Sequence, residues 1–119
     1  MSVLPHDHGP HSRHTLDHMP KNEDFVVISD LYKQLSDPTR IRIFWILCHC
    51  EECVINLSAM MEMSSPAVSH HLRQLRTAAL IVSRREGKEV YYRAADSDRA
   101  RLLHDMIESI LKITCPTAL

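Results

Sequence analysis

The segment from Ser64 to Arg76 constrains the fold of this chain more than any other stretch of the sequence. Pro66 stands where the first residues of a helix would lie, and the serines before it can cap the free backbone N–H groups. At 100° per residue, one narrow stripe of this helix is apolar: Val68, Leu72, Leu75 and Ala79. The opposite face is polar and basic, without an acid: Ser69, His70, Arg73, Gln74 and Thr77. Such a face suits either a DNA major groove or ordinary solvent exposure.

The residues on either side of this helix favour the first interpretation. Residues 54–61 predict a short helix, and Glu62-Met63-Ser64 forms a tight turn into the next one, which together predict a helix-turn-helix. After Ala79 the residues become β-branched: 80–85 and 89–93 predict two strands joined at Gly87, the only glycine after residue 9. A basic β-hairpin that directly follows a helix-turn-helix is typical of a wing that contacts phosphates or the minor groove.

Charge is concentrated in the same region. The net charge of the chain is −1, but residues 70–93 carry six Lys or Arg against two Glu. A local basic patch on a nearly neutral protein is a suitable surface for DNA phosphates. We therefore expect contacts to double-stranded DNA from eight residues: Ser65, Ser69, His70, Arg73, Gln74, Arg84, Arg85 and Lys88.

Amphipathic helices flank this unit at both ends. Residues 23–35 and 98–114 have helical apolar spacing, the latter through Leu102, Met106, Ile110 and Ile113. Between them, Asp37 and Pro38 predict the start of another helix that continues through Cys48. A small winged domain does not need this much apolar surface, so the first and last helices are expected to pair with a second copy. A two-fold dimer would match a palindromic operator.

The fold class is therefore mainly α with one β-hairpin, a winged helix-turn-helix over residues 22–119. Residues 1–21 contain five of the nine histidines and no apolar periodicity. They predict a disordered arm, which either collects metal or is a solvated tail. No apolar run is long enough to span a membrane, and no secretory signal is evident. We expect a cytoplasmic protein without a membrane partner, and four cysteines in such a chain indicate metal or thiol chemistry before disulfides.

Two groups of side chains are candidate metal ligands. Cys50 and Cys53 form a C-x-x-C pair that can share one ion, either zinc or a softer thiophilic metal, or they are small buried hydrophobes. Cys48 would face the other way and is expected to be a core thiol. On the last helix, His104, Glu108 and Cys115 point within about 40° of one direction. This second group is either a metal-binding face or a solvated one.

Four segments, in order, resemble the ArsR/SmtB family of metal-sensing winged-helix repressors: Leu35–Ile43, Glu52–Leu57, Ala67–Arg76 and Arg85–Tyr92. The resemblance covers residues 25 to about 113. It implies a homodimer, formed by the first and last helices, that binds operator DNA and releases it when metal binds. Of one family metal site, Cys53 matches the first cysteine and Ile55 replaces the second. The positions of another site read Asp96, Asp98, Ser109 and Lys112.

Together these observations predict a metal-responsive transcriptional repressor and not an enzyme, with a transition or heavy metal ion as effector. The first alternative keeps the fold but replaces the effector with a small molecule or with thiol oxidation, in which Cys50 and Cys53 would form a disulfide. The second is a metal-storage protein or metal-binding enzyme. The sequence offers it little support, because no glycine-rich phosphate loop and no nucleophile–base pair can be identified.

Overall fold

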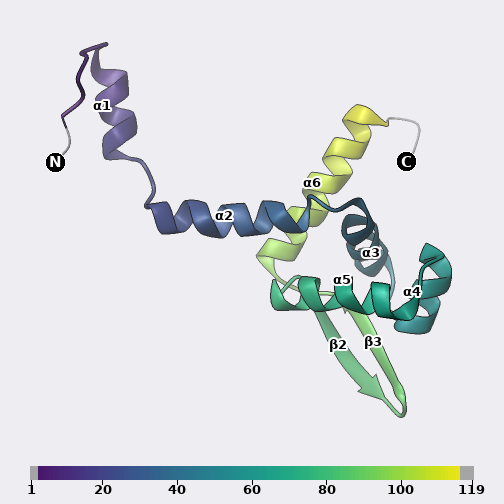
Figure 1. The fold of residues 1–119 in the computed structure, drawn as a ribbon. Helices are drawn as coiled ribbons and strands as arrows, with labels where there is room; N and C mark the ends of the chain where they lie inside the picture. Colours follow the sequence, from purple (N-terminus) through teal and green to yellow (C-terminus); the bar gives the residue numbers. More distant parts are fainter. Residues whose placement is uncertain (1–2, 116–119) are drawn as a thin grey trace. The chain divides into compact units, whose positions relative to one another are not determined.

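The computed structural model describes residues 3–115 (Figure 1). Its elements follow the order α1 (Pro10–Asp17), α2 (Asn22–Gln34), α3 (Pro38–His49), β1 (Glu52–Cys53), α4 (Val54–Met61), α5 (Ser65–Thr77), β2 (Ile81–Glu86), β3 (Glu89–Ala94) and α6 (Asp98–Thr114). This order confirms the expected fold class, a mainly α chain with one β-hairpin. Within residues 3–115, none of these helices is both long enough and apolar enough to cross a bilayer.

The chain divides into two compact units, whose boundary falls inside α2 between Asp30 and Leu31. In the first unit, the histidine-rich arm contains the helix α1, whereas the sequence predicted no regular structure there. Pro10 occupies the first turn of α1, where its fixed φ favours helix initiation. The helix has no buried residue, which explains why its sequence shows no apolar periodicity.

In the second unit, three helices begin with a side-chain cap, and two of these caps, Asp37 and Ser64, were expected from the sequence. Asp37 Oδ1 accepts hydrogen bonds from the N–H groups of Thr39 at 2.9 Å and Arg40 at 3.1 Å, at the start of α3. Ser64 accepts from the N–H of Ala67 before α5. Ser97 accepts from the N–H of Ala100 before α6. These caps fix the directions of the helices that carry the site.

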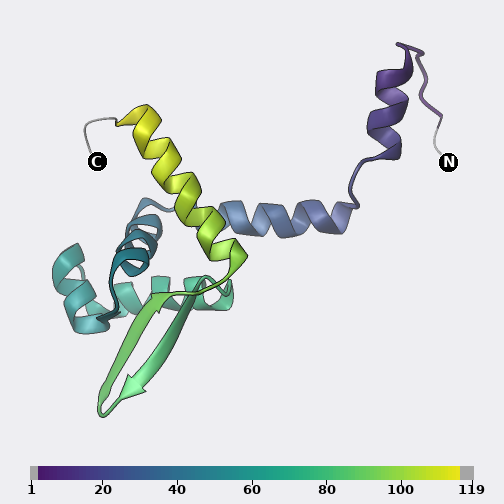
Figure 2. The same ribbon diagram turned by 180° about the vertical axis from the view of Figure 1, so that it is seen from behind.

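The wing is an antiparallel hairpin in which β2 pairs with β3 from Ile81↔Ala94 to Glu86↔Glu89. Gly87 turns it with φ of 63°, a left-handed conformation that glycine adopts without strain. The sequence did not predict the two-residue strand β1, which pairs with β3 through Glu52↔Tyr92 and Cys53↔Tyr91. A strand of two residues is too short to show alternation, and only its partner identifies it. Figures 1 and 2 show the hairpin projecting away from α3, α5 and α6.

The core of the second unit is apolar and lies between α3, α4, α5 and the start of α6. It includes Ile43, Phe44, Leu47, Leu57, Val68, Leu72, Leu75 and Leu103. On α6 the core residues are Ala100 and Leu103, whereas Leu102, Ile110 and Ile113 of the predicted stripe are exposed. On α2, Phe25, Ile28 and Tyr32 are exposed as well. Both α2 and α6 therefore present apolar side chains that their own units do not bury.

Candidate nucleic-acid interface and metal centre

The helix α5 separates its side chains as the sequence predicted, except at Ala79. The helix ends at Thr77, so Ala79 lies beyond it with φ of 60° and is exposed, not buried in the apolar stripe. Val68, Leu72 and Leu75 are buried in the core, while His70, Arg73 and Gln74 are exposed and Ser69 is half-buried. A hollow of about 200 Å³ lies beside this face, lined by Ser69, Leu72, Arg73, Arg76 and Tyr92. Because Tyr92 belongs to β3, the polar face of α5 continues directly onto the wing. This surface offers Ser, His, Arg and Gln side chains to a groove and a hairpin to the backbone beside it.

Ser65 lies at the start of α5, on the side that meets α4. Its hydroxyl lies 3.1 Å from the hydroxyl of Ser58, which in turn donates to the carbonyl of Val54 at 2.8 Å. These contacts connect the two helices of the helix-turn-helix. A role for Ser65 in DNA binding stays a prediction, and the contact to Ser58 sets the orientation from which its hydroxyl would reach a phosphate.

Arg84 of the wing is held by acidic side chains. Its Nε and Nη2 donate to both carboxylate oxygens of Glu51 at 2.6–3.0 Å, and its Nη1 donates to Glu86 at 2.6 Å. The guanidinium also lies 4.7 Å from the ring centroid of Tyr91. The hydrogen bonds to Glu51 and Glu86 raise the pKa of Arg84, and the bond from Arg84 lowers the pKa of Glu51. Arg84 is therefore engaged within the protein, in the middle of the wing where it pairs with Tyr91.

Arg85 and Lys88 are in a different situation at the tip of the wing. Both are exposed, and no ion pair joins either of them to an acidic residue among residues 3–115. Their charges are available to DNA phosphates without the loss of an internal contact. For the wing, the geometry thus favours Arg85 and Lys88 over Arg84 as DNA contacts. DNA binding by each of these three residues stays a prediction.

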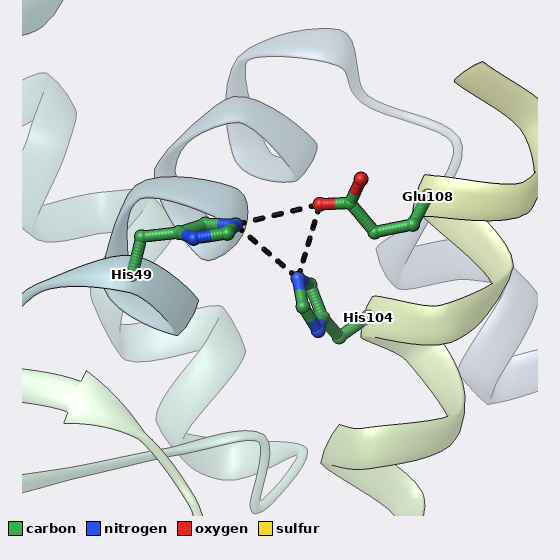
Figure 3. Close-up of side chains that lie close together, drawn as sticks. All are labelled: His49, His104 and Glu108. Atoms are coloured by element: carbon green, nitrogen blue, oxygen red, sulfur yellow. Dashed lines mark hydrogen bonds and ion pairs between the residues drawn. The ribbon is translucent and has the colours of Figure 1, made fainter. Parts of the chain in front are cut away.

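The structure brings two predicted metal ligands together with a histidine that the sequence analysis did not select. His104 and Glu108 lie one turn apart on α6 and face His49, the last residue of α3 (Figure 3). His104 Nε2 lies 3.1 Å from Glu108 Oε1 and 3.2 Å from His49 Nε2, and His49 Nε2 lies 3.4 Å from Glu108 Oε1. Within residues 3–115 this is the one group of three potential ligands whose donor atoms come within 4.8 Å of each other.

A tryptophan supports this cluster from the side. The indole N–H of Trp45, one turn before His49 on α3, donates to Glu108 Oε1 at 3.0 Å. The Trp45 and His49 rings lie 4.3 Å apart between centroids. The hydrogen bond from Trp45 is the main cause of a lowered pKa at Glu108, to which His49 and His104 add. Glu108 is therefore held as a carboxylate, the form that binds a cation.

The cysteines do not join this cluster. Cys48 is half-buried, and burial together with the nearby Glu108 carboxylate raises the pKa of its thiol to about 12, as befits a core thiol. Cys50 is exposed at the end of α3, and Cys53 is half-buried at the start of α4. Cys115 is exposed at the end of α6, where its sulfur accepts from Thr114 Oγ1 at 3.7 Å. Metal binding by Cys50, Cys53 or Cys115 stays a prediction.

Comparisons with known proteins point to one family. The model of bacterial regulatory proteins of the arsR family matches residues 37–83, from the cap of α3 into β2. A SmtB-homologue transcriptional repressor of Synechocystis is 37% identical over 83 residues, which are 70% of this chain and 63% of that protein. An arsenic resistance transcriptional regulator of Pseudomonas putida is 36% identical over 84 residues, covering 70% of this chain and 72% of that one. The solved structure of HlyU from Vibrio cholerae is 28% identical with a TM-score of 0.68, and covers 80% and 99% of the two chains.

Proposed function

The chain belongs to the ArsR family of bacterial regulatory proteins, whose members bind DNA and regulate transcription, and we propose from this premise that it is a metal-responsive repressor. In this proposal a homodimer binds a palindromic operator and leaves it when a metal ion binds. Such a protein works in the cytoplasm, beside the chromosome.

One observation carries the proposal most directly, namely the continuity between the polar face of α5 and the wing. Ser69, Arg73 and Arg76 share a hollow with Tyr92 of β3, so a DNA duplex that receives α5 in its major groove meets β3 and β2 next. Arg73 and Gln74 have side chains that can read guanine and adenine edges. Arg85 and Lys88 would contact the backbone and would set how strongly binding depends on salt.

The exposed apolar residues of α2 and α6 support the homodimer of this proposal. Leu102, Ile110 and Ile113 on α6 are solvent-exposed although the helix is strongly amphipathic. Separately, an apolar groove between α3 and α6 is lined by Ile41, Trp45, Ile107 and Leu111. Exposed apolar residues and grooves of this kind are typical of an interface between subunits. Two-fold pairing would place two copies of α5 on successive half-sites.

A metal effector is supported by the donor atoms on the chain and by the relative named for arsenic resistance. Two groups of donors are available: the thiols of Cys50 and Cys53, and the cluster of His49, His104 and Glu108. By linkage, an ion that binds more tightly to the free repressor than to the operator complex must weaken operator binding by the same factor. A coupling of a few kcal/mol would be sufficient.

A gel-shift titration with DNA from upstream of the protein's own gene tests the repressor function. Wild-type protein should bind this DNA, and Arg73→Ala should weaken binding by ~1–3 kcal/mol. Arg99→Ala, which removes an exposed arginine from α6, is the matched control and should bind normally. If Arg73→Ala and Lys88→Ala both bind as wild type at several salt concentrations, the assignment of the DNA surface is wrong.

A further inference from the structure

We propose that His49, His104 and Glu108 form a binding site for a divalent first-row transition ion such as Zn²⁺, and that an ion in this site weakens operator binding. The second half of this inference rests on the proposed repressor function. The site differs from a thiol site at Cys50 and Cys53, and it also differs from the family site whose positions are Asp96, Asp98, Ser109 and Lys112. Its third ligand comes from the end of α3.

The spacing of the three donor atoms fits one ion. Zn²⁺ binds imidazole nitrogen at ~2.0–2.1 Å and carboxylate oxygen at ~2.0–2.2 Å, so neighbouring ligands in a tetrahedral site lie about 3.3–3.5 Å apart. In the structure the corresponding separations are 3.1, 3.2 and 3.4 Å. An ion can therefore reach all three atoms after only small side-chain adjustments, with no change in the backbone.

The chemistry of the ligands selects the class of ion. Two imidazoles and a carboxylate suit zinc and its neighbours in the first transition row, whereas softer ions prefer thiolates. The His49 side chain is 45% exposed, His104 30% and Glu108 21%. The site is consequently open to solvent on the His49 side, where an ion can enter and where water can occupy a fourth position.

Trp45 supplies a second layer to this site. Its N–H donates to the same Glu108 oxygen that faces both histidines, so it orients the carboxylate as outer partners of metal ligands commonly do. Trp45 is also the only tryptophan of the chain. The tryptophan fluorescence of the protein therefore comes from this site alone.

The position of the site connects ion binding to DNA binding. His49 ends α3, and the chain then continues through β1 directly into the helix-turn-helix formed by α4 and α5. His104 and Glu108 lie on α6, the helix that exposes the apolar residues proposed for the dimer interface. An ion bound by all three residues would connect α3, which leads into the helix-turn-helix, to α6. It would thereby favour one arrangement of these two elements.

Titration of the full-length protein with Co²⁺ or Zn²⁺ tests the site itself. Co²⁺ should quench Trp45 and produce a visible absorption band at one ion per chain, and Zn²⁺ should abolish that band. His49→Ala and His104→Ala should weaken binding at least about 10-fold. Glu108→Gln should do the same, whereas Asp105→Asn, a charge-matched change on α6, should have no effect. Trp45→Phe should weaken Co²⁺ binding measured by absorption.

Two further variants keep the result unambiguous. Replacement of the five arm histidines by Ala removes ions bound to residues 6–18, and should leave the Trp45 response intact. Circular dichroism in the presence of a chelator shows whether each variant folds. If His49→Ala does not fold, His49→Gln takes its place in the titration, because glutamine fills more of the space of the imidazole. The site is overturned if His49 variants that fold bind one Co²⁺ with wild-type affinity and spectrum.

Operator titration with and without Zn²⁺ separates the site from its regulatory role. The full proposal is supported if Zn²⁺ releases wild-type protein and does not release His49→Ala. Release that persists in His49→Ala but is lost in the double variant Cys50→Ser, Cys53→Ser assigns regulation to the thiols and overturns the regulatory half. A chain that binds Co²⁺ at this site but binds no operator DNA supports the site and contradicts the repressor function.

Discussion

Cys48 and Cys50 are two residues apart, yet their surroundings predict opposite reactivity. Burial and the Glu108 carboxylate raise the pKa of Cys48 to about 12, while Cys50 is exposed. Only a thiolate is an effective nucleophile, so iodoacetamide at neutral pH should modify Cys50 well before Cys48. Peptide mass spectrometry of the native protein over time measures both rates. Equal rates in folded protein would contradict the structural placement of Cys48, and Cys48→Ser confirms the peptide assignment.

The three proposed metal ligands differ in whether they could be predicted from the sequence. His104 and Glu108 were predictable because four residues along a helix place two side chains on one face. His49 belongs to another helix, and the sequence separation of 55 residues from His104 carries no periodic signal. Its position at the end of α3 became informative only once the packing of α3 against α6 was known. The role of Trp45 as a donor to Glu108 depends on the same packing.

At the scale of one helix, Asp37 is expected to stabilise α3. Its carboxylate accepts two backbone N–H bonds, and Asp37→Ala should lower the free energy of unfolding by ~1 kcal/mol. Asp37→Asn keeps an acceptor and should cost less. Urea denaturation of the three proteins provides the comparison. If Asp37→Ala were as stable as wild type, the cap would contribute nothing measurable.

The same cap has a defined pH dependence. The backbone hydrogen bond from Arg40 is the largest cause that lowers the pKa of Asp37 below 3.8. The unfolded chain therefore binds the proton more readily, and the contribution of the charged cap is fully present above about pH 3.8. It is lost as the pH falls through the folded-state pKa. The difference in stability between wild type and Asp37→Asn should shrink over that acid range.

The contact between Glu51 and Arg84 of the wing leads to a prediction about DNA binding. Glu51 engages Arg84 through three hydrogen bonds. Glu51→Gln should loosen that engagement, so that operator binding becomes tighter and the slope of log K against log salt becomes steeper by about one unit. Glu52→Gln is the control, because it removes the same charge from the adjacent residue, whose carboxylate accepts a hydrogen bond from Asn56 and not from Arg84. An unchanged slope in Glu51→Gln, or an equal change in Glu52→Gln, contradicts this role.

Elements with strong local signals were predictable, and those that depend on partners were not. The start of α3 follows from Asp37 and Pro38, and the wing turn follows from Gly87, because caps and turns act within a few residues. The strand β1 exists only because β3 lies beside it. The helix α1 buries nothing, so its sequence lacks the apolar period by which the other helices were recognised.

For the whole molecule, the core and the exposed apolar residues have to be considered together. The period of α6 indicated an apolar stripe, but periodicity does not tell which partner buries it. The structure assigns Ala100 and Leu103 to the core and leaves Leu102, Ile110 and Ile113 in solvent. One side of α6 is therefore used within the chain, and the other is available to a second copy.

Substitution of Ile110 tests whether a second copy covers this surface. Ile110 is 54% exposed and is not part of the core, so Ile110→Asp should leave the fold of one chain intact. The buried centre of a stable interface contains few charged residues. An aspartate at this position should therefore shift the protein from dimer to monomer in sedimentation equilibrium. Operator affinity should fall with it, because one α5 helix reaches a single half-site.

Ile55→Asp is the matched control for this test. Ile55 is 67% exposed on α4, away from α6 in the sequence, and its replacement introduces the same charge at a comparably accessible apolar position. It should leave the dimer intact. If Ile110→Asp sediments as a dimer at the concentration where wild type does, α6 is not the centre of the interface. If both variants become monomers, the effect is one of general surface charge, and the paired recognition helices would need another means of assembly.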